Sequence, residues 1–544
     1  MNNSKKSANR IPAKAFATLC LFVSTLSIWA QNNPANNIVG SPLHKLILAQ
    51  SAITQLYVEG VNDSVLVEDA IKGMLENLDP HSSYTPAKEV KALTEPLEGN
   101  FEGIGIQYNL LDDTLIVIQP VSGGPSEKVG IVAGDRIITV DDSTIAGRKL
   151  TTTDIQRLLR GPKGSKVNLG VMRQGVNGIQ PFTVVRDKIP VFSIDAKYMV
   201  DPSIGYIRIN NFGATTHEEF VNAVNELKAK GMTDLIVDLQ SNGGGYLQAA
   251  VDISNEFLSA GDMIVFTEGR AMSRRDYRAT GSGILKSGKV VVLTDSYTAS
   301  ASEILSGAIQ DNDRGIIIGR RTFGKGLVQR PIELPDGSLI RLTTAHYYSP
   351  SGRCIQRPYE KGKRQQYDRE ILTRLNSGEL AHEDSIHFAD SLKYTTLKNH
   401  RTVYGGGGIM PDIYVPLDTT DITPLYRELI AKSCVTQTCI KYVEKNRKSL
   451  LKRYETFEEY RDNFTIGDDV MKLLLQHADK AKVEYNDSTL SASRRMLDIQ
   501  LKALIARDLW DMNQYYQISN LNNNIYLRAV AAIKQSEYND KLSK

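Results

Sequence analysis

Residues 290–310 read VVVLTDSYTASASEILSGAIQ, and this stretch indicates how the middle of the chain folds. Val290 to Leu293 form a continuous apolar run typical of a buried strand, Asp295 to Thr298 predict a turn, and Ser300 to Glu303 predict the start of a helix. The same order recurs on both sides of this stretch, with strands expected at 204–209, 235–239 and 316–318 and helices at 217–230, 247–258 and 302–310. Buried strands that alternate with helices predict an α/β core, which we place at residues 188–429.

Residues 98–187 have a different pattern and predict a small, mostly β domain. Short apolar strands are expected at 115–118, 136–140 and 167–171, separated by glycine-rich turns, with one helix near 153–159. The segments 31–97 and 430–544 carry apolar residues at helical spacing. The sequence therefore predicts a multidomain α+β protein: a linker with a helical N-terminal segment, an inserted β domain, an α/β core and a helical C-terminal extension.

Residues 1–30 have the pattern of an export signal. Four basic residues precede an apolar run from Ala15 to Trp29, and Ala30 is the expected last residue of the signal. The run is shorter than the ~20 residues that a membrane span needs. We therefore expect a cleaved signal and a periplasmic or secreted protein, with membrane association as the alternative if the segment is retained.

Composition excludes several classes of protein. Of the 544 residues, 41% are hydrophobic and 23% are charged, which is typical of globular chains and not of disordered ones. The formal net charge is +3, and removing the four basic charges of residues 1–30 leaves −1, so no nucleic-acid partner is expected. Beyond the signal only Cys354, Cys434 and Cys439 remain, too few and too dispersed for a disulfide framework or a zinc site. A Cys434–Cys439 bridge stays open, although a five-residue spacing within a helix turns the two thiols apart.

Two partial motifs do not carry their usual chemistry. Gly319 and the pair Gly324-Lys325 have the spacing of a phosphate-binding loop, but Gly326 stands where that loop needs Ser or Thr. His382 and His387 are five residues apart and therefore cannot share a metal on one helix face, as histidines four apart do. A Gly-x-Ser-x-Gly elbow does not occur, which argues against a conventional esterase.

Three turns carry residues with catalytic chemistry. Ser300 begins a helix, where Ser-x-x-Glu is a capping box but where free amides would also stabilise an oxyanion. Lys325 lies in a turn after a strand; a lysine there is usually solvated, and it becomes a base only when burial lowers its pKa by about 3 units. The turn from Asp238 to Gly245 follows a buried strand, and its glycines would let backbone amides point into a cleft.

Together these turns resemble those of the carboxyl-terminal processing peptidases, also called tail-specific proteases, which are S41-family serine peptidases with a PDZ domain. Thr298-Ala-Ser-Ala-Ser-Glu303 resembles the nucleophile turn of that family, and Phe323-Gly-Lys-Gly326 its lysine turn. Asp238-Leu-Gln-Ser-Asn-Gly-Gly-Gly245 resembles its glycine turn, and Leu78-Asp-Pro-His-Ser-Ser-Tyr-Thr85 its N-terminal junction. The likeness covers roughly residues 43 to 430.

The resemblance assigns roles to individual residues. It implies that Ser300, rather than Ser302, is the nucleophile, that Lys325 is the general base, and that Gln329 orients this lysine. The amides of Gly244 and Ala301 would bind the oxyanion. The glycine turn departs from the family pattern at two positions, because Gln240 replaces an arginine and Gly243 replaces a proline.

The β domain resembles a PDZ domain. Phe101-Glu-Gly-Ile-Gly-Ile106 resembles the carboxylate-binding loop, and Gly134-Asp-Arg-Ile-Ile138 the strand that follows it. In such a loop consecutive amides converge on a terminal carboxylate, while a free strand edge accepts the peptide. We therefore expect Gly103, Ile104, Gly105 and Ile106 to bind substrate tails with an apolar last residue.

The function that the resemblance implies is a serine endopeptidase that cleaves proteins near their C-termini by a Ser–Lys dyad. It implies neither a metal nor an organic cofactor, and it is compatible with a homo-oligomer and with an adaptor protein. Two alternatives remain. In a non-catalytic PDZ scaffold Ser300 would only cap a helix, and in a histidine-dependent hydrolase His81 or His346 would be the base.

Overall fold

The computed structural model describes residues 40–543, and the chain divides into two compact units, Met1–Leu78 and Asp79–Lys544. The described part of the first unit holds α2 (Pro42–Leu56) and α3 (Asp63–Glu76). The side chains of Ser41 and Asn62 cap these helices. The predicted signal, residues 1–30, lies outside the described residues. Between residues 40 and 543, no helix combines the length and the apolarity that crossing a membrane requires.

The centre of the second unit is a six-stranded sheet of the order β10-β11-β12-β15-β16-β21. Its strands are β10 (Ile194–Met199), β11 (Ile204–Ile209), β12 (Asp234–Asp238), β15 (Val290–Thr294), β16 (Ile316–Gly319) and β21 (Ile413–Tyr414). All neighbours run parallel except β10, which pairs antiparallel with β11. The carboxyl ends of the parallel strands therefore meet at one edge, which is where ligands bind in sheets of this kind.

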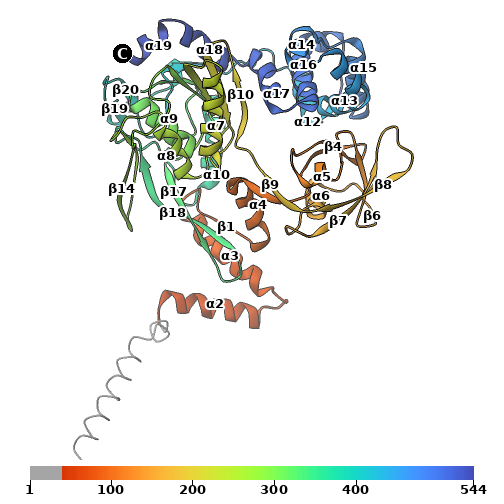
Figure 1. Cartoon of the computed structure of the whole chain (residues 1–544). Coiled ribbons are helices and arrows are strands. Elements are labelled where there is room, and N and C mark those ends of the chain that lie inside the picture. The colour runs from red at the N-terminus through yellow and green to blue at the C-terminus, as the bar shows by residue number, and fades with distance from the viewer. Residues whose placement is uncertain (1–39, 544) are drawn as a thin grey trace, which may run out of the picture. The chain divides into compact units, whose positions relative to one another are not determined.

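Helices cover both faces of this sheet. On one face, α7 (Thr216–Ala229), α8 (Leu247–Asn255) and α9 (Ala301–Asp311) share an apolar core with Ile207 and Val292. On the other face, α18 (Asn524–Lys534) and α19 (Glu537–Ser543) contribute Ile525 and Tyr538 to a second core. Figure 1 shows α18 and α19 in dark blue against the core. The last twenty described residues therefore pack on the α/β sheet, although they follow the C-terminal helices in sequence.

A second, antiparallel sheet carries part of the candidate site. It consists of β1 (Ser83–Thr85), β18 (Leu339–Tyr348), β13 (Met263–Gly269) and β14 (Met272–Arg278), with β17 (Leu327–Glu333) paired to β18. The long insertion after it adds short elements: α10 (Arg364–Asp368), α11 (Glu370–Asn376), η2 (Glu383–Ser385), η3 (Asp390–Leu392), β19 (Lys393–Thr395) and β20 (Thr402–Tyr404).

The predicted β domain follows α4 (Ala87–Glu98) and is joined to it by the paired strands β2 (Asn100–Gly103) and β9 (Asp187–Pro190). Its sheet contains β3 (Ile106–Leu111), β4 (Thr114–Pro120), β5 (Arg136–Val140), β6 (Ser143–Thr144), β7 (Lys166–Met172) and β8 (Ile179–Val185), with the helices α5 (Pro125–Lys128) and α6 (Thr152–Leu159). Strand β3 ends the sheet, so one of its edges is unpaired within the described sheet.

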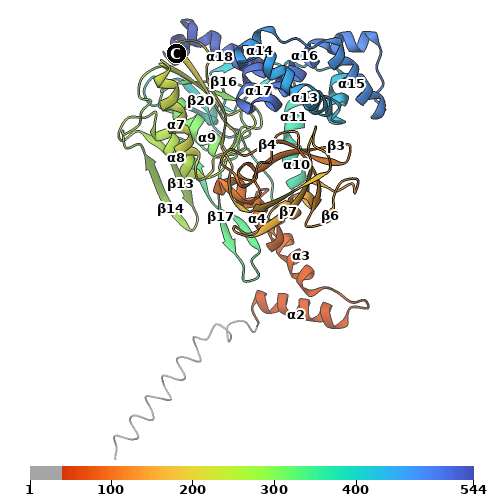
Figure 2. The ribbon, with the colours of Figure 1, turned by 45° about the vertical axis from the view of Figure 1, so that its right-hand side comes forward.

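The helices after the core form a bundle with its own apolar core, which we call the helical domain (residues 424–523). Its helices are α12 (Pro424–Ala431), α13 (Cys434–Arg453), α14 (Phe457–Asn463), α15 (Asp468–Lys480), α16 (Asp487–Leu509), α17 (Met512–Ser519) and η4 (Asn520–Asn522). Cys434 and Cys439 are both buried in it as free thiols, so the bridge left open above does not form. Arg136 of the β domain forms a bidentate ion pair with Glu444 of α13, and the two domains lie side by side in Figures 1 and 2. The predicted multidomain α+β fold class is confirmed.

Candidate active site

Ser300 lies in a strained turn directly before α9. Its φ of 59° and ψ of −116° are unusual for a residue with a side chain, and such strain is concentrated at functional sites. Asp295 organises the turn by accepting hydrogen bonds from the amides of Tyr297 and Thr298 at 2.9 and 3.0 Å. Ser300 is half-buried, whereas Ser302 is fully buried and its hydroxyl donates to the carbonyl oxygen of Asn242 at 3.0 Å. Ser302 therefore has a structural partner of its own.

Lys325 lies in the turn between β16 and β17, as a half-buried residue. Its Nζ donates to Oε1 of Gln329 at 3.0 Å, and Nε2 of Gln329 donates to the carbonyl oxygen of His81 at 2.5 Å. Burial, and after it the charge of Arg341, lower the pKa of Lys325 from 10.5 to about 8. The predicted pair of Lys325 and Gln329 is therefore brought together, and the N-terminal junction holds the glutamine in place.

Glu303 joins the two turns. Its buried carboxylate accepts the amide of Ser300 at 2.8 Å, the amide of Lys325 at 2.9 Å and the amide of Gly324 at 2.7 Å, together with the hydroxyl of Thr322. Burial raises the pKa of Glu303, and these hydrogen bonds oppose the rise. The sequence revealed Glu303 only as part of a capping box. Its role as a shared acceptor for both turns could not be seen there.

Tyr347 makes a second link between the two turns. Its hydroxyl contacts the carbonyl oxygen of Ser300 at 3.1 Å and also that of Lys325. The side chain is buried on β18, in the sheet that carries Gln329. The two turns are thus fixed to each other through both a carboxylate and a phenol.

The glycine turn packs directly against Ser300. Gly244 has a φ of 97°, and a Cβ built on it would lie 2.8 Å from the Cβ of Ser300 and 2.8 Å from the amide nitrogen of Ala301. A side chain is therefore not tolerated at this position. The expected oxyanion role of its amide meets an obstacle, because this amide donates to Oδ1 of Asn242 at 2.8 Å. In this conformation Gly244 offers no free donor, whereas the amide of Ala301 has no partner among the described residues.

The replacement of arginine by Gln240 in the glycine turn has local compensation. Asp238, which ends β12 just before the turn, accepts Nη1 of Arg208 at 2.7 Å and the hydroxyl of Tyr206 at 2.5 Å. The amide and the side chain of Gln240 also donate to Asp238, at 2.8 and 3.2 Å. The positive charge next to this carboxylate thus comes from Arg208 on β11. In the family pattern an arginine stands at position 240 of the turn instead.

Neither histidine of the alternative mechanism is placed as a base. The ring of His81 lies 2.9 Å from the hydroxyl of Tyr367, and burial together with Lys325 lowers its pKa to about 3. His346 Nδ1 lies 3.9 Å from the sulfur of Cys354. In the described part of the chain, neither ring is hydrogen-bonded to Ser300.

The predicted carboxylate loop opens between β2 and β3. The carbonyl oxygen of Ile104 accepts the amide and the hydroxyl of Ser126 at 3.1 and 2.7 Å, and that of Gly105 accepts the amide of Val121 at 2.9 Å. The amides of Ile104 and Gly105 have no partner within residues 40–543. Gly105 has a φ of 72°, whereas the side chain of Ile104 is buried in the domain core. The loop therefore offers backbone donors, and Ile104 contributes through its amide rather than its side chain.

Models of known protein families match several parts of this chain. The profile of peptidase family S41 matches residues 203–362, and that of the PDZ domain matches 103–178. The N-terminal domain of the activating protease CtpB matches 23–89, and a family of unknown function (DUF8443) matches 425–511.

Individual relatives are similar over most of their own length. A carboxy-terminal-processing protease of Bartonella bacilliformis is 38% identical over 305 residues, which cover 55% of this chain and 69% of that protein. The carboxy-terminal processing protease CtpA of Bacillus subtilis is 35% identical over 363 residues, covering 66% and 76%. Among solved structures, a photosystem II D1 C-terminal processing protease is 30% identical and covers 59% of this chain and 85% of its own, with a TM-score of 0.34. The chain therefore belongs to the family of carboxy-terminal processing proteases, serine peptidases that carry a PDZ domain.

Proposed function

We propose that this protease cleaves its substrates near their C-termini with Ser300 as the nucleophile and Lys325 as the general base. The observation that carries the proposal is the state of Lys325, whose Nζ is held by Gln329 and whose pKa is lowered to about 8. Only a neutral amine accepts a proton, and a pKa near the working pH gives the lysine a useful neutral fraction.

In the proposed reaction, Lys325 accepts the proton of the Ser300 hydroxyl as the oxygen attacks the scissile carbonyl. The C–N bond of the tetrahedral adduct then breaks, and the leaving amine takes the proton from Lys325, which leaves the acyl-enzyme. Water hydrolyses this ester, giving one proton to Lys325, which returns it to the Ser300 oxygen. Gln329 holds one Nζ hydrogen and so limits the orientations of the amine. Glu303 supports this step because it fixes the backbone of both turns, which keeps nucleophile and base in register.

The oxyanion needs donors beside Ser300. We assign the Ala301 amide to this role because it is unpartnered and lies at the N-terminus of α9, where the helix dipole favours negative charge. Gly244 becomes a second donor when its bond to Asn242 opens as the substrate binds.

In this proposal the PDZ domain selects the substrate tails. The free amides of Ile104 and Gly105 suit a terminal carboxylate, and the unpaired edge of β3 suits an extended peptide. Gly103 and Ile106 flank these amides. The expected substrates are therefore proteins with a free C-terminus and apolar last residues.

The test compares cleavage of a protein that has a free apolar tail with cleavage of the same protein carrying an amidated tail. Wild-type enzyme should cleave the free tail faster, mainly through a lower KM. Ser300→Ala should abolish cleavage, whereas Ser302→Ala, the matched control, should retain it at a stability cost of ~1 kcal/mol. Tail binding without any cleavage by the wild type would favour the scaffold alternative, and equal rates on both tails would refute the role of the PDZ domain in selecting substrate tails.

We also propose export to the periplasm or the cell exterior, which the pattern of residues 1–30 supports. The N-terminus of the protein isolated from cells tests this directly. It should begin at Gln31, and a retained Met1 would favour a membrane anchor.

A further inference from the structure

The helical domain has no part in the mechanism above, yet one of its helices reaches the back of the glycine turn. The ring of Tyr516, on α17, lies against the guanidinium of Arg208, with 4.6 Å between Cζ and the ring centroid. Residues 425–511 match a family of unknown function, and α17 follows directly after them. This contact connects a domain without an assigned role to the candidate site.

Arg208 is the side chain that holds the start of the glycine turn. Its Nη1 donates to the carboxylate of Asp238 at 2.7 Å and its Nη2 to the carbonyl oxygen of Gln240 at 2.8 Å. The Arg208 side chain is 12% exposed and Asp238 is fully buried. Burial is the largest influence and lowers the pKa of Arg208, but Asp238 together with Tyr206 and Tyr516 outweighs it and raises the pKa, so the guanidinium stays charged. Any displacement of this group would therefore move both Asp238 and Gln240.

The tyrosine is the partner that covers the guanidinium. The Nε atom of Arg208 is buried and has no hydrogen-bond partner among the described residues, so hydrogen bonds hold only one side of the group. An aromatic face over a desolvated guanidinium is a favourable cation–π arrangement. Tyr516 therefore packs against the part of the Arg208 guanidinium that no hydrogen bond holds.

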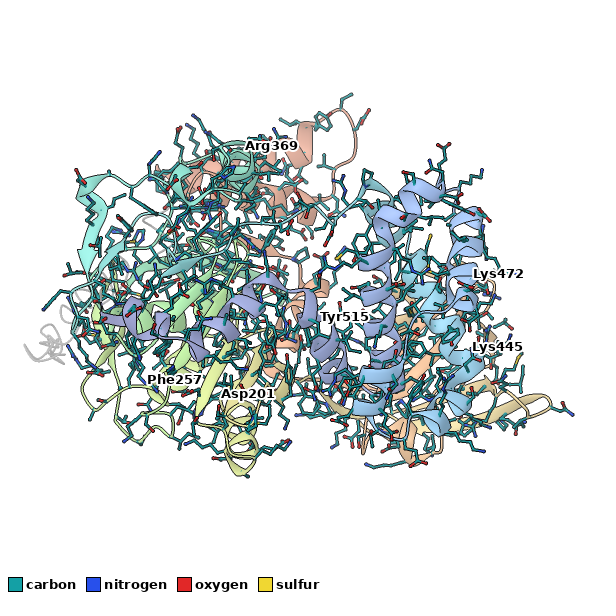
Figure 3. The ribbon with its side chains drawn as sticks, turned by 90° about the horizontal axis from the view of Figure 1, so that it is seen from above. Asp201, Phe257, Arg369, Lys445, Lys472 and Tyr515 are labelled. Carbon is teal, nitrogen blue, oxygen red and sulfur yellow. The ribbon has the colours of Figure 1, made fainter. Side chains whose placement is uncertain are left out.

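Helix α17 is anchored in both domains. Tyr515 and Ile518 pack in the core of the helical domain, whereas Tyr516 packs in the core below the α/β sheet. Figure 3 labels Tyr515 where this helix passes between the helical domain and the α/β core. Oδ1 of Asn513 also accepts the amide of Lys197 on β10 at 2.9 Å. The helix thus transmits the position of the helical domain to the sheet.

The glycine turn in turn contacts the nucleophile. The carbonyl oxygen of Asn242 accepts the amide of Ala299 at 2.9 Å, and Gly244 packs on Ser300. A continuous chain of contacts therefore runs from Tyr516 through Arg208 and the glycine turn to Ser300.

We propose that the helical domain is part of the positioning apparatus of the protease: Tyr516 of α17 fixes Arg208, and Arg208 fixes the glycine turn beside Ser300. Tyr516 and Arg208 are positioning residues, since neither touches the reacting atoms. The inference rests on the proposed function, because it takes Ser300 to be the nucleophile.

The proposal predicts a specific kinetic pattern. Tyr516→Leu keeps much of the bulk but removes the aromatic face, and kcat should fall about tenfold or more while KM stays within about twofold. Tyr516→Phe keeps the face and should retain most of kcat. A short peptide that lacks a PDZ-binding tail should show the same loss, because the effect lies at the glycine turn.

The matched control is Ile518→Ala. Ile518 lies on the same helix and is buried in the core of the helical domain, whereas the ring of Tyr515 packs edge-on against Tyr516 and is unsuitable as a control. Ile518→Ala should lower the melting temperature at least as much as Tyr516→Leu does and leave kcat within about twofold of wild type. If both variants lose kcat equally, the effect comes from the integrity of the helical domain and the proposal is overturned.

A double-mutant cycle keeps the test decisive if Tyr516→Leu proves unstable. Arg208→Lys keeps the charge but loses the planar fork, so it should lower kcat by itself. Adding Tyr516→Leu to it should cost little more, because both changes act through one contact. Fully additive losses would contradict the chain of contacts.

Failure of the inference is distinguishable from failure of the proposed function. If Ser300→Ala retains turnover, the nucleophile assignment itself is wrong. If Ser300→Ala is inactive but Tyr516→Leu keeps wild-type kcat, the proposed function stands and only the positioning role is refuted.

Discussion

The pH dependence of cleavage separates a lysine base from a histidine base. With a pKa of about 8, roughly 1% of Lys325 is neutral at pH 6 and roughly 90% at pH 9. If the neutral form is the active one, kcat/KM should rise about 90-fold over this range. A histidine with an ordinary pKa of about 6.5 would give a rise of only about fourfold.

The assay is the initial rate of cleavage of a quenched fluorescent peptide with a free apolar tail, at substrate concentrations well below KM. Ser300→Ala supplies the background at each pH. Arg341→Gln provides a second perturbation: since the positive charge of Arg341 lowers the pKa of Lys325, its removal should move the profile towards higher pH. Arg330→Gln is the control, because Arg330 is an exposed residue of the neighbouring strand.

Two results would refute this reasoning. One is a wild-type profile with its midpoint near pH 6.5, which would point to a histidine. The other is a Lys325→Arg variant within about tenfold of wild type, because a guanidinium stays protonated throughout this range and cannot accept the serine proton.

The geometry makes three further predictions. Gly244→Ala should lower kcat about a hundredfold, because its Cβ would meet Ser300 at 2.8 Å; Gly243→Ala, which meets nothing within 4 Å, should stay near wild type in the same assay. Glu303→Gln should lower the free energy of unfolding by ~2 kcal/mol or more and also lower kcat, as measured by urea denaturation and peptide cleavage, because the amide group cannot accept all the donors that the carboxylate does. Lys325→Met should be inactive but more stable at pH 7, since the depressed pKa costs the folded state ~3 kcal/mol below pH 8, and this cost disappears as pH rises towards 10.5. Equal stability of the methionine variant and the wild type at every pH would contradict a desolvated, destabilising lysine.

Much of the fold could be predicted because the decisive signals are local. Continuous β-branched runs such as Val290 to Leu293 must be buried, and the helical patterns between them fix the α/β order. The same locality singled out Ser300 and Lys325, since each lies in a turn after a buried strand, whereas the choice of Ser300 over Ser302 and the selection of Gln329 came from the resemblance to the family. The structure brings Lys325 and Gln329 into direct contact.

The sequence could not reveal contacts between residues that lie far apart along the chain. Glu303 reads as a helix cap, and its bonds to the lysine turn depend on how two loops meet. The capture of the Gly244 amide by Asn242 depends on the rotamer of one side chain. The helical pattern of residues 524–543 is visible in the sequence, but nothing local indicates that these helices cover the α/β sheet. The contact of Tyr516 with Arg208 joins positions more than three hundred residues apart.

The identity of the nucleophile is the central claim, and a covalent serine probe tests it most directly. The protein is treated with a fluorophosphonate at pH 9, digested, and the modified residue is located by mass spectrometry. The account predicts a single adduct on Ser300, much faster labelling at pH 9 than at pH 6, and no labelling of Lys325→Met. An adduct on Ser302, or labelling of Ser300 that is independent of Lys325, would contradict it.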